Sequence, residues 1–184
     1  QSGTTFYINL GANANTKTTA WKRAVHGPFY YYDCESWGNR TEPVAGEGHG
    51  FASDDMTDSA TYWRCKAWSN AGAGFQCQYT NSIAFNACLA YSNSLSNFRT
   101  TGYTDTLAYA GCTSADSVQH GYLFATPFTA VTIKNSVAFR NALYGIIGAT
   151  SGATATNNAT YGNGSGATSN VTNSNPVTAD PQLT

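Results

Sequence analysis

Hydrophobic residues recur along this chain at fixed positions, separated by short polar stretches. Two copies of one motif begin at Tyr62 and Phe85, which are 23 residues apart. A constant period in this range indicates an architecture of stacked repeats. With the motif cysteine as position zero, the zero positions are Leu10, Cys34, Cys65, Cys88, Cys112, Ser136 and Asn158. The one long interval contains an insertion from Arg40 to Glu47, which we predict to be a surface loop.

Other columns repeat together with the zero column. Position −3 holds Tyr7, Tyr31, Tyr62, Phe85, Tyr109, Ile133 and Ala155. Position −5 holds Thr5, Phe29, Ala60, Ile83, Leu107, Val131 and Ala153. Position +2 holds only small residues, namely Ala12, Ser36, Ala67, Ala90, Ser114, Ala138 and Thr160. This spacing is typical of strands whose alternate side chains point inward.

The apolar stretches are too short for long helices, because Asn and Gly interrupt them every four to six residues. Each repeat therefore forms about three short strands and one turn of a coil. The predicted fold is all-β: a single-stranded right-handed parallel β-helix of about seven rungs, in one domain. We expect the rungs to occupy residues 1–163 and an irregular segment, 164–184, to close the coil.

Asn recurs at position +5, where only Ser117 interrupts a column of Asn15, Asn39, Asn70, Asn93, Asn141 and Asn163. Asn tolerates left-handed backbone, and its amide can bond to the next rung, so we expect it at the corners. Rungs stack about 4.8 Å apart, and like charges at that spacing repel. A charged content of only 10% is consistent with such stacking.

The overall charge narrows the range of partners. A net charge of −1 gives no electrostatic reason to expect binding to nucleic acid or to an anionic membrane. No apolar run approaches the roughly 20 residues of a membrane span. The chain starts at Gln1 and contains sequons at Asn39, Asn158, Asn163 and Asn170, so we expect a processed, secreted protein with these four asparagines as glycosylation candidates. Sequons also arise by accident in a chain this rich in Asn and Thr.

Four of the five cysteines share the zero column. Parallel side chains on successive rungs keep their Cβ atoms farther apart than the roughly 3.8 Å that a disulfide prefers. We therefore expect buried free thiols that pack as small hydrophobic groups. A metal site is disfavoured because no Cys-x-x-Cys or histidine pair accompanies the cysteines.

Two further groups of residues are candidates for binding. Asp54, Asp55 and Asp58 are predicted to project from a turn, where they either hold Ca²⁺ or form a solvated acidic turn. We expect no other cofactor. Position +3 faces outward by strand parity and holds the aromatic residues Trp37, Trp68, Tyr91, Phe139 and Tyr161. These side chains either contact a glycan or a protein partner, or only stack on one another.

The repeat resembles that of pectate lyases of the ninth polysaccharide lyase family. The similar segments are Cys65 to Asn70 with the following Gly74-Phe75, Phe85 to Phe98, and Ile133 to Asn141. The resemblance covers about residues 47–163 and concerns the scaffold. It implies a pectate-lyase-like solenoid and, for the family, β-elimination of uronan chains. In that chemistry a Ca²⁺ held by aspartates acidifies the proton next to the uronate carboxylate, and a lysine removes it.

The catalytic positions depart from the family. The first metal aspartate is replaced by His49, and the next three by Gly72, Ala73 and Gln76. The lysine is replaced by Arg99, which is a base only if its high pKa is overcome. The resemblance therefore implies that the Ca²⁺ site of the family is missing, and it leaves Arg99 with His49 as the only candidates for catalysis.

Three classes of function remain open. The chain is a non-catalytic structural or surface-assembly subunit that associates with copies of itself, a uronan lyase with a rebuilt site, or a glycan-binding module. We favour the first class, because the metal carboxylates are missing and no helix is predicted to cap either end of the coil. Edge strands left open in this way invite end-to-end pairing.

Overall fold

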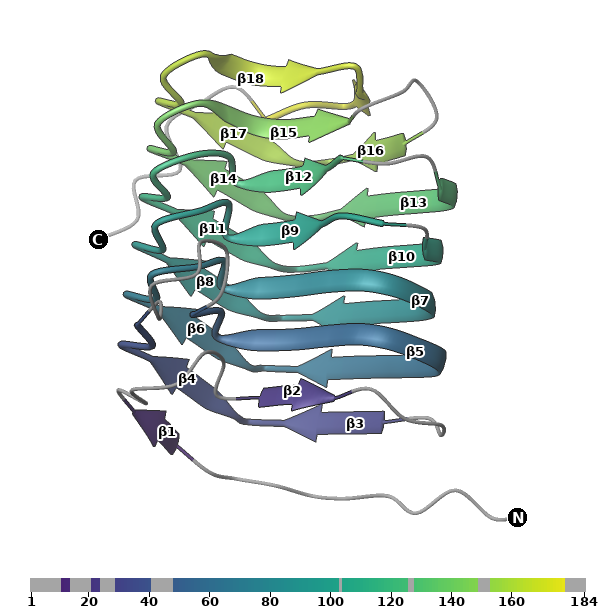
Figure 1. The fold of residues 1–184 in the computed structure, drawn as a ribbon. Helices are drawn as coiled ribbons and strands as arrows, with labels where there is room; N and C mark the ends of the chain where they lie inside the picture. The colour runs from purple at the N-terminus through teal and green to yellow at the C-terminus, as the bar shows by residue number, and fades with distance from the viewer. Residues whose placement is uncertain are drawn as a thin grey trace.

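The computed structural model describes residues 11–13, 21–23, 29–40, 48–102, 104–125, 128–148 and 153–177. These residues form an all-β parallel solenoid without any helix, as predicted. Successive turns of the chain lie on top of one another, with β1 (Gly11–Asn13) near one end and β18 (Gly166–Ser169) near the other (Figure 1). The predicted strand at Phe6–Leu10 and most of the insertion, residues 41–47, lie outside the described residues.

One sheet consists of seven parallel three-residue strands, one from each successive repeat. In spatial order they are β1, β4 (Glu35–Trp37), β6 (Lys66–Trp68), β8 (Leu89–Tyr91), β11 (Thr113–Ala115), β14 (Val137–Phe139) and β17 (Ala159–Tyr161). Each of these strands carries positions +1 to +3 of its repeat, so the sequence register places them correctly.

The second sheet has twelve strands and covers two further faces of the coil. In two rungs a single long strand, β5 (Phe51–Trp63) or β7 (Phe75–Asn86), runs across both faces (Figure 1). The strands of the first face are β2 (Trp21–Arg23), β9 (Phe98–Thr100), β12 (Tyr122–Phe124), β15 (Tyr144–Gly148) and β18. Those of the second face are β3 (Phe29–Tyr32), β10 (Thr104–Ala110), β13 (Phe128–Lys134), β16 (Ala153–Thr156) and β19 (Thr172–Ser174).

The strand pairing confirms the predicted columns wherever the structure describes them. At position −3, Tyr31 pairs with Tyr62, and the column continues through Phe85, Tyr109, Ile133 and Ala155. At position +2, the small residues from Ala12 to Thr160 pair in one continuous row. The positions Thr5, Tyr7, Leu10 and Asn15 lie outside the described residues.

The core contains a second aromatic column, which lies outside the repeat positions −5, −3, 0 and +2. It runs through Phe51, Phe75, Phe98 and Tyr122, whose rings stack at centroid distances of 4.8–5.1 Å. Its rings meet those of position −3 edge to face at 5.3–5.7 Å. Both geometries are favourable for aromatic pairs. The two columns together fill the narrow interior.

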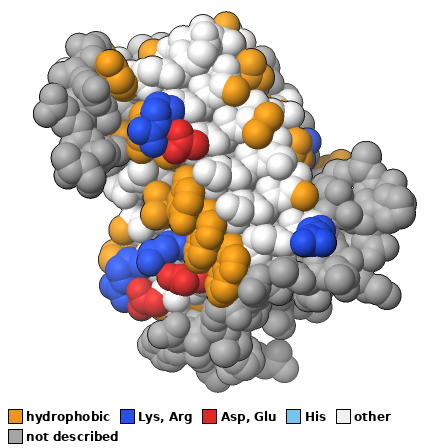
Figure 2. Space-filling model, turned by 90° about the vertical axis from the view of Figure 1, so that its left-hand side faces the viewer, with side chains coloured by type: hydrophobic (Ala, Val, Ile, Leu, Met, Phe, Trp, Pro, Cys, Tyr) orange, Lys and Arg blue, Asp and Glu red, His pale blue; other side chains and the backbone are white. Residues whose placement is uncertain are grey.

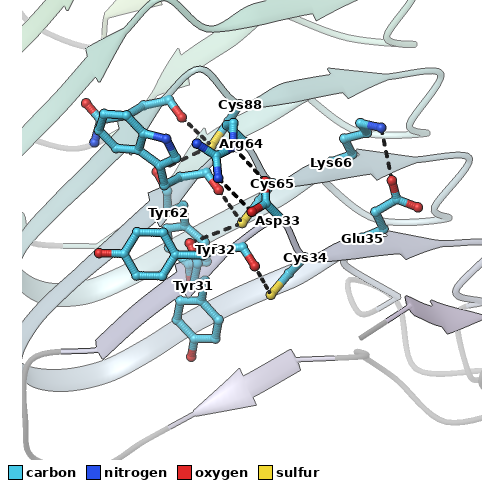
Figure 3. A network of polar contacts seen from close by, with 12 residues as sticks. Tyr31, Tyr32, Asp33, Cys34, Glu35, Tyr62, Arg64, Cys65, Lys66 and Cys88 are labelled. Atoms are coloured by element: carbon cyan, nitrogen blue, oxygen red, sulfur yellow. Dashed lines mark hydrogen bonds and ion pairs between the residues drawn. The ribbon is translucent and has the colours of Figure 1, made fainter. Parts of the chain in front are cut away.

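The four motif cysteines are buried free thiols in one inward column, as predicted. Their Sγ atoms donate to carbonyl oxygens, for example Cys65 to the oxygen of Tyr31 at 3.5 Å and Cys88 to that of Tyr62 at 3.5 Å (Figure 3). All four thiols are almost completely buried, and their Sγ atoms contact backbone carbonyl oxygens. These thiols therefore act as packing groups.

The corners differ from the prediction. Left-handed backbone lies at position −1, for example in Arg64 (φ 52°) and Ala87 (φ 51°), and at position +4, as in Ser69 (φ 53°) and Ser92 (φ 54°). None of the +5 asparagines from Asn39 to Asn163, all of which the structure describes, has a positive φ. From β4 to β17, two left-handed residues bend the chain sharply on either side of the three-residue strand. Asn at +5 is therefore selected for its side-chain hydrogen bonds.

Those bonds form a ladder along the coil. The backbone N and Nδ2 of Asn39 both donate to Oδ1 of Asn70, at 3.2 and 2.8 Å. Asn70 donates in the same way to Asn93, and Asn141 to Asn163. Where Ser117 replaces Asn, the neighbouring Asn97 fills the gap: it accepts from Asn93 at 2.7 Å and donates to the carbonyl of Ala115 at 2.8 Å. The predicted inter-rung bonding is confirmed.

The predicted boundary at residue 163 is wrong. Strands β18 and β19 continue the coil, pairing in parallel with β15 and β16, and Val177 bridges to Ala159. Thr, Gly, Ser and Asn give little hydrophobic signal, so the continuation is invisible to a pattern of apolar positions. Residues 178–184 lie outside the described residues.

Candidate functional site

The outward aromatic column lies on the seven-stranded sheet, as predicted. Trp37 stacks on Trp68 with centroids 4.9 Å apart and planes inclined by 5°, and Trp68 stacks on Tyr91 at 5.8 Å and 2°. Figure 2, which views this side of the coil, shows a run of hydrophobic side chains across the surface. The faces of these three rings are turned toward one another, so mainly ring edges are left for a partner.

The column changes character toward the C-terminus. Ala115 interrupts it, and beyond the gap the guanidinium carbon of Arg140 lies 4.7 Å from the ring centroid of Phe139. Tyr161 is 42% exposed. Of the five aromatic candidates, Tyr161 thus presents the most accessible side chain, whereas Trp37, Trp68 and Tyr91 form a self-stacked ladder.

Ion pairs between successive rungs flank the stacked tryptophans. Arg64 binds Asp33 with two hydrogen bonds, at 2.6 and 2.7 Å, and Lys66 binds Glu35 at 3.0 Å (Figure 3). The Arg64 guanidinium holds the pKa of Asp33 below its ordinary value. All four side chains are solvent-exposed, so these pairs contribute little to stability and mainly balance the surface charge.

His49 has a structural hydrogen bond. It is 7% exposed, and its Nδ1 accepts from the backbone N–H of Ala73 at 2.9 Å. A Cβ on Gly72 would lie 2.5 Å from that nitrogen, so only glycine fits beside the imidazole. Three of the four positions where the family has metal aspartates are therefore occupied by one tightly packed corner.

The fourth position belongs to a polar cluster on the outer face of β7 and β9. Nη1 of Arg99 donates to Oε1 of Gln76 at 2.8 Å, and Nε2 of Gln76 donates to Oγ1 of Thr101 at 2.7 Å. Partial burial lowers the pKa of Arg99. Arg99 forms no ion pair within the described parts of the chain. It is thus a half-buried cation whose partner is a neutral amide.

The candidate catalytic pair does not come together. The cross-strand neighbours of Arg99 are Gln76 and Leu123, whereas His49 lies at the corner before β5, two strands away. Among the described residues, no group of three or more His, Cys, Asp and Glu side chains is placed to hold a metal.

The turn predicted at Asp54, Asp55 and Asp58 is wrong. The backbone of all three residues belongs to β5, which has a register irregularity between Met56 and Ser59. The chain turns the corner of the coil here within one long strand, so the aspartates that suggested a turn lie in extended backbone. Their side chains lie outside what the structure describes.

A second histidine has a similar role to His49 and was missed in the sequence. Nδ1 of His120 accepts from the backbone N of Tyr144 at 3.2 Å, and the two rings stack at 6.0 Å. Burial lowers the pKa of His120, which favours the neutral ring that this bond needs. Both histidines lie two residues before an inward aromatic residue, Phe51 or Tyr122. This shared spacing is the sequence pattern by which the role of His120 could have been predicted.

The four sequon asparagines fall into two groups. Asn39 and Asn158 are buried and hydrogen-bonded, so a glycan on either would prevent its packing. Asn163 is half-buried and Asn170 is exposed. Asn163 and Asn170 therefore remain the better candidates for glycosylation.

The two ends of the coil carry strands with a single partner. Within the described residues, β1 pairs only with β4, and β2 only with β5. At the other end β18 pairs only with β15, and β19 only with β16. Among the described residues, each of these four strands has a strand partner on one edge only, which is the arrangement that allows another strand to add.

Comparisons with models of protein families, with curated proteins and with solved structures found no significant match. The similarity to the ninth polysaccharide lyase family therefore rests on the repeat residues of the sequence. No helix long and apolar enough to cross a membrane occurs in the described ranges.

Proposed function

We propose that this chain is a secreted, non-catalytic β-helix protein that acts as a structural subunit by stacking copies of itself end to end. The coil is proposed to be right-handed, because crossovers between parallel strands are right-handed in nearly all proteins. The seven strands of the first sheet support the prediction of about seven rungs.

The observation that carries this proposal is the strand pairing at the two ends of the coil. Strands β1 and β2 at the N-terminal end and β18 and β19 at the C-terminal end have one strand partner each among the described residues. Each added inter-rung hydrogen bond contributes roughly 0.5–1.5 kcal/mol net. A rung of such bonds, summed over three faces, is able to offset the freedom lost on association.

The residues at the lyase positions support a role without catalysis. His49 and Gly72 build a corner, and Arg99 binds a side-chain amide. We expect no Ca²⁺-dependent cleavage of polygalacturonate, measured as ultraviolet absorbance of the unsaturated product with Ca²⁺ or with chelator. Metal-dependent turnover that is lost in Arg99→Ala would support the lyase function instead.

Sedimentation velocity over a wide range of protein concentration tests the structural role. We expect species larger than a monomer whose share grows with concentration, and they should persist when the exposed Arg64 is replaced in Arg64→Gln. A single monomeric species at the highest concentration would overturn the proposal.

Polysaccharide binding is a second candidate function, and Arg99 is the observation that favours it. The Arg99 guanidinium is partly buried, and among the described residues its side-chain partner is an amide, so it can still form a charge-assisted bond to an external carboxylate. A uronan chain presents one carboxylate per sugar ring, in contrast to a neutral glycan.

Affinity electrophoresis in polygalacturonate gels separates this candidate from the first. The wild-type chain and Arg140→Gln should be retarded equally, because Arg140 already pairs with Asp116. Arg99→Gln should lose the retardation. Equal mobility of all three chains with and without polygalacturonate would remove glycan binding as a function.

A further inference from the structure

Four buried cysteines on successive rungs have the same surroundings and form a column inside the coil: Cys34, Cys65, Cys88 and Cys112. Their backbone carbonyls all accept from the next rung, at 2.8–2.9 Å. The Sγ atoms of the last three each contact the carbonyl at position −3 of the preceding rung, at 3.4–3.5 Å. All four also contact the carbonyl two residues earlier in their own rung, at 3.4–3.6 Å. The four side chains therefore have one orientation.

This shared orientation fixes the distance between neighbouring sulfur atoms. Identical side chains on rungs about 4.8 Å apart keep their ends about 4.8 Å apart. Figure 3 shows the sulfur atoms of Cys34, Cys65 and Cys88 in a row across three rungs. Side-chain hydrogen bonds link Cys65 to both of its neighbours, and Cys88 to Cys112. The thiols are thus close to one another but too far apart for a disulfide, whose bond is about 2.05 Å long.

The same distance suits a metal ion held between two thiols. A metal–thiolate bond is about 2.3 Å long, so two such bonds in a line span about 4.6 Å, close to the spacing of the rungs. Soft sulfur ligands select soft ions such as Cu⁺, which is stable with two sulfur ligands in a line. Zn²⁺ needs four ligands, and the described residues hold no group of three or more His, Cys, Asp and Glu side chains for it.

We propose that the cysteine column binds soft monovalent ions, Cu⁺ or Ag⁺, each between the sulfur atoms of two neighbouring rungs. One ion lies between Cys34 and Cys65, and a second between Cys88 and Cys112. Each ion displaces one thiol proton to solvent, so a thiolate and a thiol share the ion. The charge of the interior is then unchanged, as burial in a core of low polarity demands. This site does not depend on self-association.

Serine is the substitution that tests the column with least disturbance. Ser136 occupies the same position of a later rung, is 1% exposed, and donates from Oγ to the carbonyl two residues earlier at 3.0 Å. Its hard oxygen does not replace a thiolate toward a soft ion. Cys77 supplies the control, because it is also buried but has Ser53 and Thr100, not cysteines, beside it on the adjacent rungs.

Two double variants separate the arrangement of the thiols from their number. Cys34→Ser with Cys65→Ser leaves two thiols on neighbouring rungs, whereas Cys65→Ser with Cys112→Ser leaves two thiols with a rung between them. The second pair of sulfur atoms is about 9.6 Å apart, too far for one ion to bridge. Any difference in binding between these variants therefore reports the contact between adjacent rungs.

The experiment is titration of the reduced chain with Cu⁺ under nitrogen, in competition with bicinchoninate. Because the column is closed to solvent, the ion is offered both to the folded chain and during refolding from urea. We expect about two ions per chain for the wild type and for Cys77→Ser, and about one for the variant with neighbouring thiols. The variant with separated thiols should bind at least about a hundredfold more weakly. X-ray absorption at the copper edge should show two sulfur neighbours at about 2.3 Å.

Circular dichroism checks that each variant keeps the coil, and alanine replaces serine where it does not. Three results would overturn the inference. The two double variants would bind Cu⁺ equally, Cys77→Ser would lose an ion, or the wild-type chain would take up no Cu⁺ under either condition. None of these results bears on the proposed self-association.

Discussion

The middle of the coil and its C-terminal end have the same strand register but different interiors. The inward columns in the middle hold large aromatic residues, namely Tyr62, Phe75, Phe85, Phe98, Tyr109 and Tyr122. At the C-terminal end the same columns hold Ile146, Ala155, Thr168 and Asn173. Burial of apolar surface is therefore concentrated in the middle, and the end depends more on hydrogen bonds between rungs.

The corners show the same contrast. At the left-handed position −1 the middle has Arg64 and Ala87, which gain nothing from that conformation. The C-terminal rungs have Asn135, Asn157 and Asn175 there, and Asn adopts it more readily. Strong packing overrides local backbone preference in the middle, whereas the weakly packed end uses residues whose local preference already fits.

The largest expected effect is the loss of a central aromatic ring. Phe98 is fully buried and stacks between Phe75 and Tyr122, so Phe98→Ala should cost about 3–5 kcal/mol of the free energy of unfolding. Val171→Ala at the end should cost about 1–2 kcal/mol. Urea unfolding of the two variants measures both values. Equal losses would show that the two regions do not differ as described.

Removal of an amide side chain should also cost more free energy of unfolding in the middle of the coil than at its end, with smaller values than removal of a ring. Asn93 makes four hydrogen bonds through its side chain and is fully buried, so Asn93→Ala leaves partners unsatisfied and should cost about 2–3 kcal/mol. Asn173 makes two bonds with Asn158 and is partly exposed, so water replaces them and Asn173→Ala should cost about 0.5–1 kcal/mol. Thermal unfolding ranks the pair, and a reversed order would contradict the comparison.

The smallest expected effect is an increase in the free energy of unfolding. Ala87 is exposed with φ of 51°, and Ala87→Gly should stabilise the coil by about 0.5–1 kcal/mol, since relief of the left-handed strain exceeds the entropy cost of glycine. The matched change Ala110→Gly, on an exposed strand residue, should destabilise by a similar amount. If Ala87→Gly lowered the free energy of unfolding instead, the left-handed corners in the middle of the coil would not be strained.

The sequence predicted the register because several columns agree at once. Side chains at −5, −3, 0 and +2 repeat only if successive rungs lie in one alignment, and all the described pairs follow it. The aromatic column at +3 was placed on the outer face by strand parity alone, which the pairing of Trp37 with Trp68 confirms. In a repeat, long-range contacts can be predicted, because a residue pairs with the residue at the same position of the next rung.

Features that no recurring residue type marks in the sequence were not predictable in this way. The left-handed residues at −1 and +4 include Arg64, Ala87 and Ser69, whose identities give no sign of that backbone. The substitution of Asn97 for the missing amide at Ser117 depends on a side chain from another corner. Strand β19 lacks apolar residues altogether, so only its pairing with β16 reveals it.

Electron microscopy of the unmodified chain, with the axial spacing of the assemblies measured, tests the central claim most directly. We expect unbranched filaments one coil wide, with strands perpendicular to the long axis and a continuous repeat of about 4.8 Å along it, as stacking on the coil axis requires. Discrete particles of the size of one chain, or filaments whose strands run along the axis, would contradict end-to-end assembly.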